Sequence, residues 1–409
     1  MKFSQIIFQE MKPEKTNLAD LFRSAAENLA PQLSIWRRHL HSHPELSYEE
    51  FETMKYVSEE LDKIGITHKS GIAGTGIVAT IESNDPSSRF MALRADLDAL
   101  PIQELNDVPY VSCNPGVMHA CGHDVHTTSL LGAAHILSNN KSHWRGTVRL
   151  IFQPGEEKLP GGASLMVAEG VLKNPVPSHI LGSHVFPELP AGHVGMRPGT
   201  YMASADEIHL TILGKGGHAA LPENQSNPLI VASEILLALE KLINERPDPS
   251  IKTVLAFGFI EGKGATNVIP NEVHLKGTFR SLDETWRYEV HKKIKTIVEE
   301  ICLKRGATAD LKIPVGYPSV YNDPDLTSKM KSSAIAFLGA DKVHDLPIRM
   351  TAEDFSFYAN EIPGCFYRIG TSSPNSDLGH SGLHTPHFDV DESSLKLGAG
   401  LMAYAAATT

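Results

Sequence analysis

Hydrophobic positions at the start of the chain recur with a helical period. This spacing predicts an amphipathic helix over Leu18–His41 and a second helix that begins near Phe51 and is closed by Gly65. Ser47 and Glu50 stand at the separation of a capping box just before the second helix. We therefore expect two helices before the first strand.

Short runs of β-type residues follow, with helical stretches between them. The predicted strands are Gly76–Ile81, Phe90–Arg94, Thr147–Phe152 and Ile180–Val185. The predicted helical stretches are Thr128–Leu137 and Ala163–Glu169. Because strands alternate with helices, we expect an α/β sheet covered on both faces, with active residues at the strand ends.

The pattern changes near Asp206, where apolar and polar residues begin to alternate. The predicted elements are then a strand around Ile208–Ile212, a helix Asn227–Asn244, strands Thr253–Ile260 and Glu272–Phe279, a helix Asp283–Lys304 and a strand Ala309–Ile313. The order β-α-β-β-α-β is the ferredoxin-like arrangement. We therefore expect an inserted domain at 199–313, with 1–198 and 314–409 forming the other domain.

The last segment predicts a helix at Asp323–Phe337, a strand at Gly364–Gly370, a loop at Leu378–His387 and a final helix at Glu392–Ala406. The four-stranded sheet of the inserted domain would have open edges. Because pairing an edge with a second copy is one way to cover it, the pattern favours a homodimer or a higher homo-oligomer.

Composition limits the class of protein. A chain of 409 residues is too long for one ordinary core, and its 41% hydrophobic and 21% charged residues are typical of a globular protein. The net charge of −11 argues against nucleic acid or an anionic membrane as a partner. Residues 1–17 have too short an apolar patch for a signal peptide, which favours the cytoplasm. The four cysteines are too scattered for a disulfide framework.

The segment Met118–His126 contains several groups that can bind metal, namely a thiol, imidazoles and a carboxylate. These groups bind zinc or manganese, and Glu156 and Glu157, after a predicted strand, could add a base beside such a metal. Taken alone, Cys121 is also typical of a small buried hydrophobe, and the glutamate pair of a solvated helix start.

For several other side chains, the sequence is compatible with two roles. Arg280 could bind a carboxylate or pair with Asp283 or Glu284 at the surface. We interpret His41, His43 and His126 as structural groups or as residues that orient metal ligands, and His119 as a group near the metals or a support for its loop.

A set of separated motifs, in a fixed order, covers the chain from His39 to Asp391. The motifs are Arg37–His41 with Pro44–Ser47, Arg94–Pro101, His119–Asp124, Gln153–Glu157, Gly214–Ala219, Thr266–Pro270, Gly277–Arg280, Glu353–Phe355 and Leu383–Pro386. With them the sequence resembles the dimetal amidohydrolases that include aminoacylases and carboxypeptidase G. The cysteine-bearing form resembles the branch of hippurate hydrolases, indole-acetyl-amino-acid hydrolases and N-acetyl-diaminopimelate deacetylases.

The resemblance implies a fold and a metal centre. The fold would be an α/β catalytic domain with a mixed, zinc-exopeptidase-like sheet, and an inserted ferredoxin-like domain for dimerisation or as a lid. Cys121 would bridge two divalent ions per subunit, zinc or manganese, with cobalt or nickel also suited to these ligands. His123 and His184 would complete one site, and Glu157 and His384 the other.

The resemblance also implies roles in catalysis and in substrate binding. Glu156 would be the general base, and His218 would reach the tetrahedral oxyanion from the partner subunit. Asn267 and Arg280 would hold the free carboxylate of the substrate. The orienting residues would be Asp96 and Asp124. The sequence departs from the family pattern at Lys158–Pro160, where glycines are usual, and at Ala352, where serine is common.

The function implied is hydrolysis of a small-molecule N-acyl amino acid, hippurate-like or N-acetylated, to a carboxylic acid and a free amino acid. A metallocarboxypeptidase or dipeptidase would use the same chemistry on short peptides. A cysteine nucleophile, Cys121 with His123 or His126, is an alternative that predicts indifference to chelators. A binding protein without catalysis would have no need of Glu156.

Overall fold

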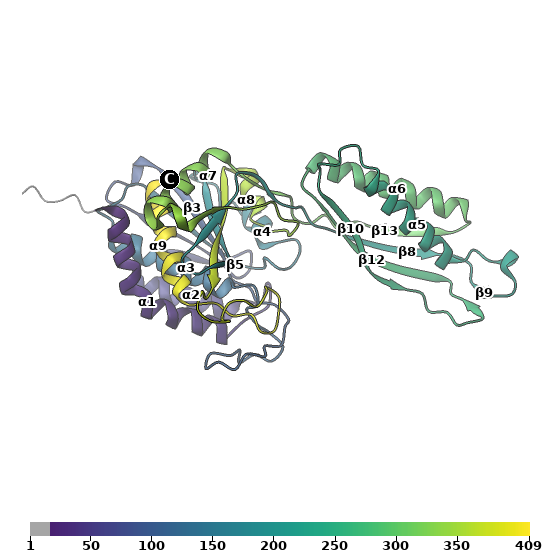
Figure 1. Cartoon of the computed structure of the whole chain (residues 1–409), viewed down its shortest axis with the longest axis horizontal. Helices are drawn as coiled ribbons and strands as arrows, with labels where there is room; N and C mark the ends of the chain where they lie inside the picture. Colours follow the sequence, from purple (N-terminus) through teal and green to yellow (C-terminus); the bar gives the residue numbers. More distant parts are fainter. Residues whose placement is uncertain (1–16) are drawn as a thin grey trace, which may run out of the picture.

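The computed structural model describes residues 17–409, and it has a large body from which a smaller module projects (Figure 1). The large body contains a mixed sheet of eight strands in the order β1-β2-β4-β3-β5-β16-β6-β15. Its strands are β1 (His68–Ile72), β2 (Gly76–Glu82), β3 (Phe90–Asp96), β4 (Thr147–Gln153), β5 (Ile180–Pro190), β6 (Val194–Met196), β15 (Val343–Asp345) and β16 (Gly364–Ser372). The predicted α/β class with a mixed sheet is confirmed.

Helices cover both faces of this sheet, each over its own buried cluster of apolar side chains. The first face carries α1 (Leu18–Ser42), α2 (Phe51–Ile64), α3 (His123–Asn139), α7 (Pro324–Leu338) and α9 (Ser393–Thr408). The second face carries α4 (Gly162–Ala168) and α8 (Ser356–Glu361), together with the short pair β7 (Gly199–Met202) and β14 (Val320–Asn322). Among residues 17–409, no helix combines the length and apolarity that crossing a membrane requires.

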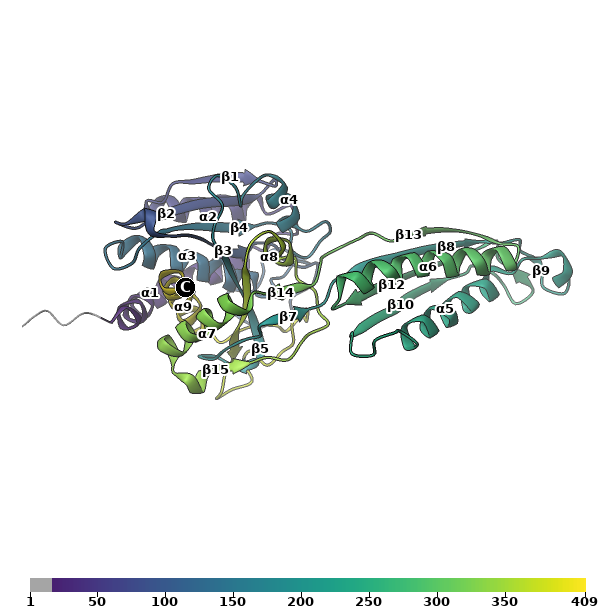
Figure 2. The same ribbon diagram turned by 90° about the horizontal axis from the view of Figure 1, so that it is seen from above.

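The small module is a four-stranded antiparallel sheet in the order β10-β12-β8-β13, with helices α5 and α6 packed on one face (Figure 2). Its elements are β8 (Asp206–Leu213), α5 (Pro228–Asn244), β10 (Thr253–Glu261), β12 (Glu272–Ser281), α6 (Glu284–Lys304) and β13 (Thr308–Lys312). A short pair, β9 (Gly217–His218) and β11 (Val268–Ile269), lies at the end of the module away from the large body in both views. This order of strands is the predicted ferredoxin-like one.

Some predicted boundaries were wrong, for physical reasons. The predicted capping box does not form: the Ser47 hydroxyl donates to Asp98, and the Glu50 side chain accepts from Thr75 and from the backbone N–H of Gly155. Strand β5 continues past Val185 to Pro190, so that His184 lies inside the strand and not at its end. The short strands β6, β7, β14 and β15 and the polar β1 were not predicted. Residues 1–16, on which the expected cytoplasmic location largely rests, lie outside the described residues.

Candidate metal centre

The metal centre is built around the turn that precedes α3. Gly122 adopts a left-handed backbone with φ +79°, and a Cβ at this position would lie 2.5 Å from the Val185 side chain. Only glycine meets both demands, the positive φ and the close approach to β5. The turn therefore presents Cys121 and His123 on either side of Gly122, against the strand that carries His184.

Cys121, His123 and His184 form the first group of ligand atoms, which all lie within 4.8 Å of one another. The Cys121 Sγ is 3.4 Å from the His184 Nε2. The His184 Nδ1 donates a hydrogen bond of 2.8 Å to the carbonyl oxygen of Val185, which leaves its Nε2 free to face the thiol. Burial and the nearby Arg368 hold the pKa of His184 well below its usual value, so that the ring is neutral and can bind a metal.

His123 shows an unfilled bonding position at the same place. Its Nδ1 lies 3.2 Å from the Asp98 Oδ1, while its Nε2 is buried without a hydrogen-bond partner among the described residues. Burial disfavours the charged ring, but the carboxylates of Asp96 and Asp98 outweigh this effect and raise the pKa of His123 to about 10. This unpaired buried nitrogen fits a metal ligand, because a divalent cation can take the place of the proton that the neighbouring carboxylates stabilise.

Cys121, Glu157 and His384 form the second group within the same limit of 4.8 Å. The His384 Nε2 is 3.3 Å from the Cys121 Sγ and 3.1 Å from the Glu157 Oε1. His384 has φ +60°, which is rare outside glycine, and its backbone N–H donates a 2.8 Å hydrogen bond to the Ala120 carbonyl. The backbone therefore holds this imidazole over the thiol at a conformational cost of about 1 kcal/mol or more.

The two groups share one sulfur atom, and their donors are those that zinc and manganese accept. Burial and the carboxylates of Glu157 and Glu156 raise the pKa of the Cys121 thiol well above its usual value. These negative groups would stabilise a divalent cation, which in turn favours the thiolate. The residues present therefore fit divalent metal ions, and Cys121 would belong to both groups of ligands.

Asp98 organises the groups around this cluster, a role that the sequence did not suggest. Its Oδ1 and Oδ2 each accept a hydrogen bond of 3.0 Å, from the backbone N–H groups of Glu156 and Glu157 respectively. The Ser47 hydroxyl donates to Oδ2 at 2.6 Å, and Oδ1 also faces His123. One carboxylate thus fixes a proposed ligand imidazole and the backbone of both glutamates.

Glu156 is 7% exposed and lies among other carboxylates. Its side chain is within 4.8 Å of the carboxylates of Glu353 and Asp354. Burial, followed by the charges of Glu353 and Glu157, raises the pKa of Glu156 well above its usual value. Arg94 offsets part of this charge, because its guanidinium lies 3.0 Å from Glu353 and 2.8 Å from Asp354. A high pKa is suited to a group that must both accept and return a proton.

The two predicted orienting aspartates lie in different surroundings. Asp96 accepts a 2.6 Å hydrogen bond from the His126 Nδ1, and the His126 Nε2 accepts one of 2.9 Å from the Val185 backbone N–H. His126 thereby anchors β5 beside His184. Asp124 bonds to Arg37 at 2.9 Å and to His41 at 2.7 Å, and its hydrogen-bond partners among the described residues include none of the proposed ligands.

The residues predicted to bind substrate do not all lie near this cluster. His218 is exposed on β9, and Asn267 lies beside it, since the Asn267 carbonyl accepts from the Ala219 N–H at 3.0 Å. Both are at the end of the module away from the large body (Figure 1). Arg280 is at the opposite end, where its Nη1 donates to the Met350 carbonyl at 3.2 Å, and it forms no ion pair with Asp283 or Glu284.

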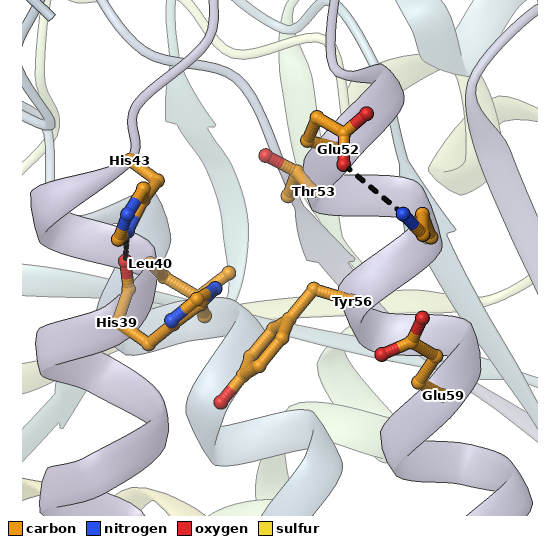
Figure 3. Close-up of a pocket in the computed structure, with 8 residues that line it drawn as sticks. His39, Leu40, His43, Glu52, Thr53, Tyr56 and Glu59 are labelled. Atoms are coloured by element: carbon orange, nitrogen blue, oxygen red, sulfur yellow. Dashed lines mark hydrogen bonds and ion pairs between the residues drawn. The ribbon is translucent and has the colours of Figure 1, made fainter.

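A separate hollow of about 260 Å³ lies between α1 and α2 (Figure 3). His39 stacks between Tyr56 and His43, with ring centroids 3.8 Å and 4.5 Å apart respectively. None of the proposed metal ligands lines it. His119, which is also outside the ligand groups, is buried with both ring nitrogens unpaired among the described residues, and burial lowers its pKa to about 4.

Comparison with known proteins identifies a family and several relatives of this chain. The model of peptidase family M20/M25/M40 matches residues 92–408. The chain is 40% identical to IAA-amino acid hydrolase ILR1-like 5 of Arabidopsis thaliana, over 90% of this chain and 84% of that protein. It is 38% identical to N-acetyl-L-cysteine deacetylase of Bacillus subtilis, over 90% and 85% respectively. The solved structure of the Bacillus subtilis YXEP protein, a dinuclear metal-binding peptidase of the M20 family, superposes with a TM-score of 0.78 at 33% identity, over 93% of this chain and 98% of that one.

Proposed function

Because the chain belongs to peptidase family M20/M25/M40 and is a hydrolase of that family, we propose that it cleaves the amide bond of N-acyl amino acids. The products are a carboxylic acid and a free amino acid, and the substrates are hippurate-like or N-acetylated. Relatives that act on amino-acid conjugates support this choice by their names. The observation that carries the proposal is the pair of ligand groups that share Cys121, with the buried Glu156 beside them.

We assign His123 and His184 with Cys121 to one divalent ion, and Glu157 and His384 with Cys121 to the other. The dinuclear metal site named for a structural relative at 33% identity supports two ions, zinc or manganese, with cobalt or nickel as alternatives. When bound, such ions make a water molecule more acidic and polarise an amide carbonyl. His184 is held neutral by its burial, and His123 is oriented by Asp98, so both rings point a nitrogen at the centre.

Glu156 is assigned the proton transfers. Its Oε2 lies 4.0 Å from the His123 Nε2, so the carboxylate adjoins the first ligand group. It accepts a proton from the attacking water and then donates it to the nitrogen of the departing amino acid. The surrounding carboxylates of Glu353 and Asp354 stabilise the protonated form of Glu156 between these two transfers.

The remaining groups act on the substrate. We assign the free carboxylate of the amino acid to Arg280, which lies at the junction between module and body. His218 and Asn267 lie at the far end of the module, so we assign their contacts with the oxyanion and the carboxylate to the site of a second copy of the chain. The proposal therefore includes a homodimer, in which the module serves both dimerisation and closure.

Replacing the base tests the mechanism. The Glu156→Ala variant is expected to bind two metal ions per chain, as the wild type does, and to lose nearly all turnover of N-acetyl and N-benzoyl amino acids. Metal content is measured by elemental analysis, and turnover by the amino acid released. Glu223→Ala, which changes an exposed glutamate of the module, is the control and should behave as wild type. Substantial activity in Glu156→Ala would refute the assigned base.

A second candidate function is cleavage of short peptides, which the peptidase named among the solved relatives favours. The same site chemistry serves both reactions, so only the substrate separates them. A panel of dipeptides beside acylated amino acids distinguishes the two. A cysteine nucleophile, by contrast, predicts activity that survives chelators, and inactivation by EDTA with recovery on adding metal would exclude it.

A further inference from the structure

Arg368 is a buried cation that neighbours the metal centre. It is 3% exposed, and it lies on β16 opposite His184 of the parallel strand β5. Residues paired in register on neighbouring strands project from the same face of a sheet. Arg368 and His184 therefore project from the same face of the sheet.

The guanidinium of Arg368 has only weak partners. Its Nε donates to the Tyr201 hydroxyl at 3.1 Å, and its Nη2 contacts the Met202 Sδ at 3.1 Å. The rings of Phe366, Tyr201 and Phe186 surround its central carbon at 5.2, 5.8 and 6.0 Å from their centroids. Within residues 17–409, its Nη1 has no hydrogen-bond partner, and no carboxylate lies within ion-pair distance.

The other buried arginines show what this position lacks. Arg37 binds Asp124 and Asp389, Arg94 binds three carboxylates, and Arg287 binds Asp206. Arg149 donates to backbone carbonyls. A buried charge without a partner is costly, and the cost is recovered when an anion binds to it. Arg368 is therefore prepared for a negatively charged group that comes from outside the chain.

A second arginine connects Arg368 to the junction with the module. Arg349 lies over the ring of Phe186, which also contacts Arg368, at 4.7 Å from its centroid. The next residue, Met350, accepts the hydrogen bond from Arg280. The segment of Arg349 and Met350 therefore contacts Arg280 through a backbone carbonyl and shares the Phe186 ring with Arg368.

We propose that Arg368 selects substrates that carry a second carboxylate, in addition to the one assigned to Arg280. The inference rests on the proposed function and narrows its substrate class. The second carboxylate belongs either to a dicarboxylic acyl group or to an acidic amino-acid side chain, and both offer the same planar anion to a guanidinium. Phe186, Tyr201 and Phe366 hold that guanidinium in place and keep water away from it.

Two matched pairs of compounds separate these sources. N-succinyl-L-alanine is compared with N-butanoyl-L-alanine, and N-acetyl-L-glutamate with N-acetyl-L-glutamine. The wild type is expected to show a kcat/KM about 10- to 100-fold higher for the anionic member of at least one pair. Calorimetric binding of the same compounds to metal-loaded Glu156→Ala protein should show the same preference without turnover.

Variants assign the preference to the residue. Arg368→Met removes the charge and keeps an unbranched side chain against the aromatic rings, and it should bring the ratio within each pair close to one. Arg368→Lys should keep part of the preference. Arg349→Met is the control, because the Arg349 guanidinium also lies over the Phe186 ring but already pairs with Glu188 at 3.4 Å. This variant should leave the kcat/KM ratio within each pair largely unchanged. Thermal unfolding and metal content confirm that each variant is folded.

The inference is overturned if the wild type has no preference in either pair, or if Arg368→Met lowers both members equally. Equal losses for both members would mean that Arg368 only balances the charge of the buried carboxylates. A loss in Arg349→Met as large as in Arg368→Met would also overturn the assignment. If the wild type hydrolyses none of the four compounds, the proposed function fails, and the calorimetric ratio still decides the role of Arg368.

Discussion

At the scale of single residues, Asp98 shows how one carboxylate can set a whole site. It faces His123 and accepts from Ser47 and from the backbone of Glu156 and Glu157. These partners come from three separate segments of the chain, so the motif Arg94–Pro101, which contains Asp98, does not reveal them. Burial opposes its charge, but the hydrogen bond and the charge of His123 keep the pKa of Asp98 below its usual value.

We expect Asp98→Asn to weaken metal binding by about 10- to 100-fold, the usual effect of losing a carboxylate that orients a ligand histidine. Asparagine keeps one acceptor but loses the charge, and its amide cannot accept from both glutamate N–H groups. Competition with a chromogenic chelator measures the affinity. Asp310→Asn, at an exposed position of β13, is the control. An unchanged affinity in Asp98→Asn would mean that the backbone alone positions the ligands.

The role proposed for Arg368 also depends on residues that are distant in the sequence. In the sequence it is one residue of the predicted strand Gly364–Gly370, and nothing in a strand pattern shows which side chain will lie beside His184. Similarly, Ser47 and Glu50 have capping-box spacing, but Asp98 and Thr75 bind them instead. Tertiary partners therefore decide roles that local spacing leaves open.

At the scale of elements, the long helices and the central strands were predictable because their apolar periods are strong. The helix predicted over Asn227–Asn244 forms as α5, and the Asn227 side chain caps it by accepting from the Leu229 N–H. The strands that were missed are β1, which is mostly polar, and β6, β7, β9, β11, β14 and β15, which have two to four residues each. So short a run carries no period, and these strands form because neighbouring backbone is already in place.

The start of α3 is the element-level feature most open to test. Gly122→Ala should destabilise the protein by about 2 kcal/mol or more, because the new Cβ would meet Val185 as well as the strain of a positive φ. Gly65→Ala is a matched control, since Gly65 has the same φ of +79° but no atom within 4 Å of a Cβ. Urea unfolding of both variants measures the difference.

The Gly122→Ala variant should also bind metal less tightly, because Cys121 and His123 flank the distorted turn. If the two glycine variants were destabilised equally, the close contact with Val185 would not matter. Glycine would then be required at position 122 only because of its positive φ.

At the scale of the whole molecule, the proposed site residues are divided between the large body and the projecting module. The proposed ligands are in the large body, and His218 is at the far end of the module (Figures 1 and 2). The family motifs predicted both sets of residues, but the sequence alone could not show that a single chain leaves them apart. This separation is the reason why we propose a site shared between two copies of the chain.

Mixing variants tests that sharing. His218→Ala and Glu156→Ala are each expected to be nearly inactive alone. Mixed in equal amounts and allowed to exchange subunits, they should recover about a quarter of wild-type activity, because half the dimers are mixed and each has one complete site. Subunit exchange is checked with differently tagged chains. Exchange without recovery would place His218 in the site of its own chain.

The two segments that connect module and body lie close enough together for the module to be removed or exchanged. The two connecting segments run side by side: the Ala205 N–H donates to the Tyr317 carbonyl at 2.9 Å, and Asp206 accepts from the Gly316 N–H at 2.9 Å. The body also has its own apolar clusters, separate from that of the module. Entry and exit points this close are typical of a domain inserted into a host that was already able to fold.

A short glycine-serine loop in place of residues 206–315 should therefore leave a shortened body that folds cooperatively and still binds metal, while lacking Arg280, His218 and Asn267. Circular dichroism, thermal unfolding and metal content would show this. Such a body would separate metal binding from the contributions of the module, and other modules could be joined at the same two points.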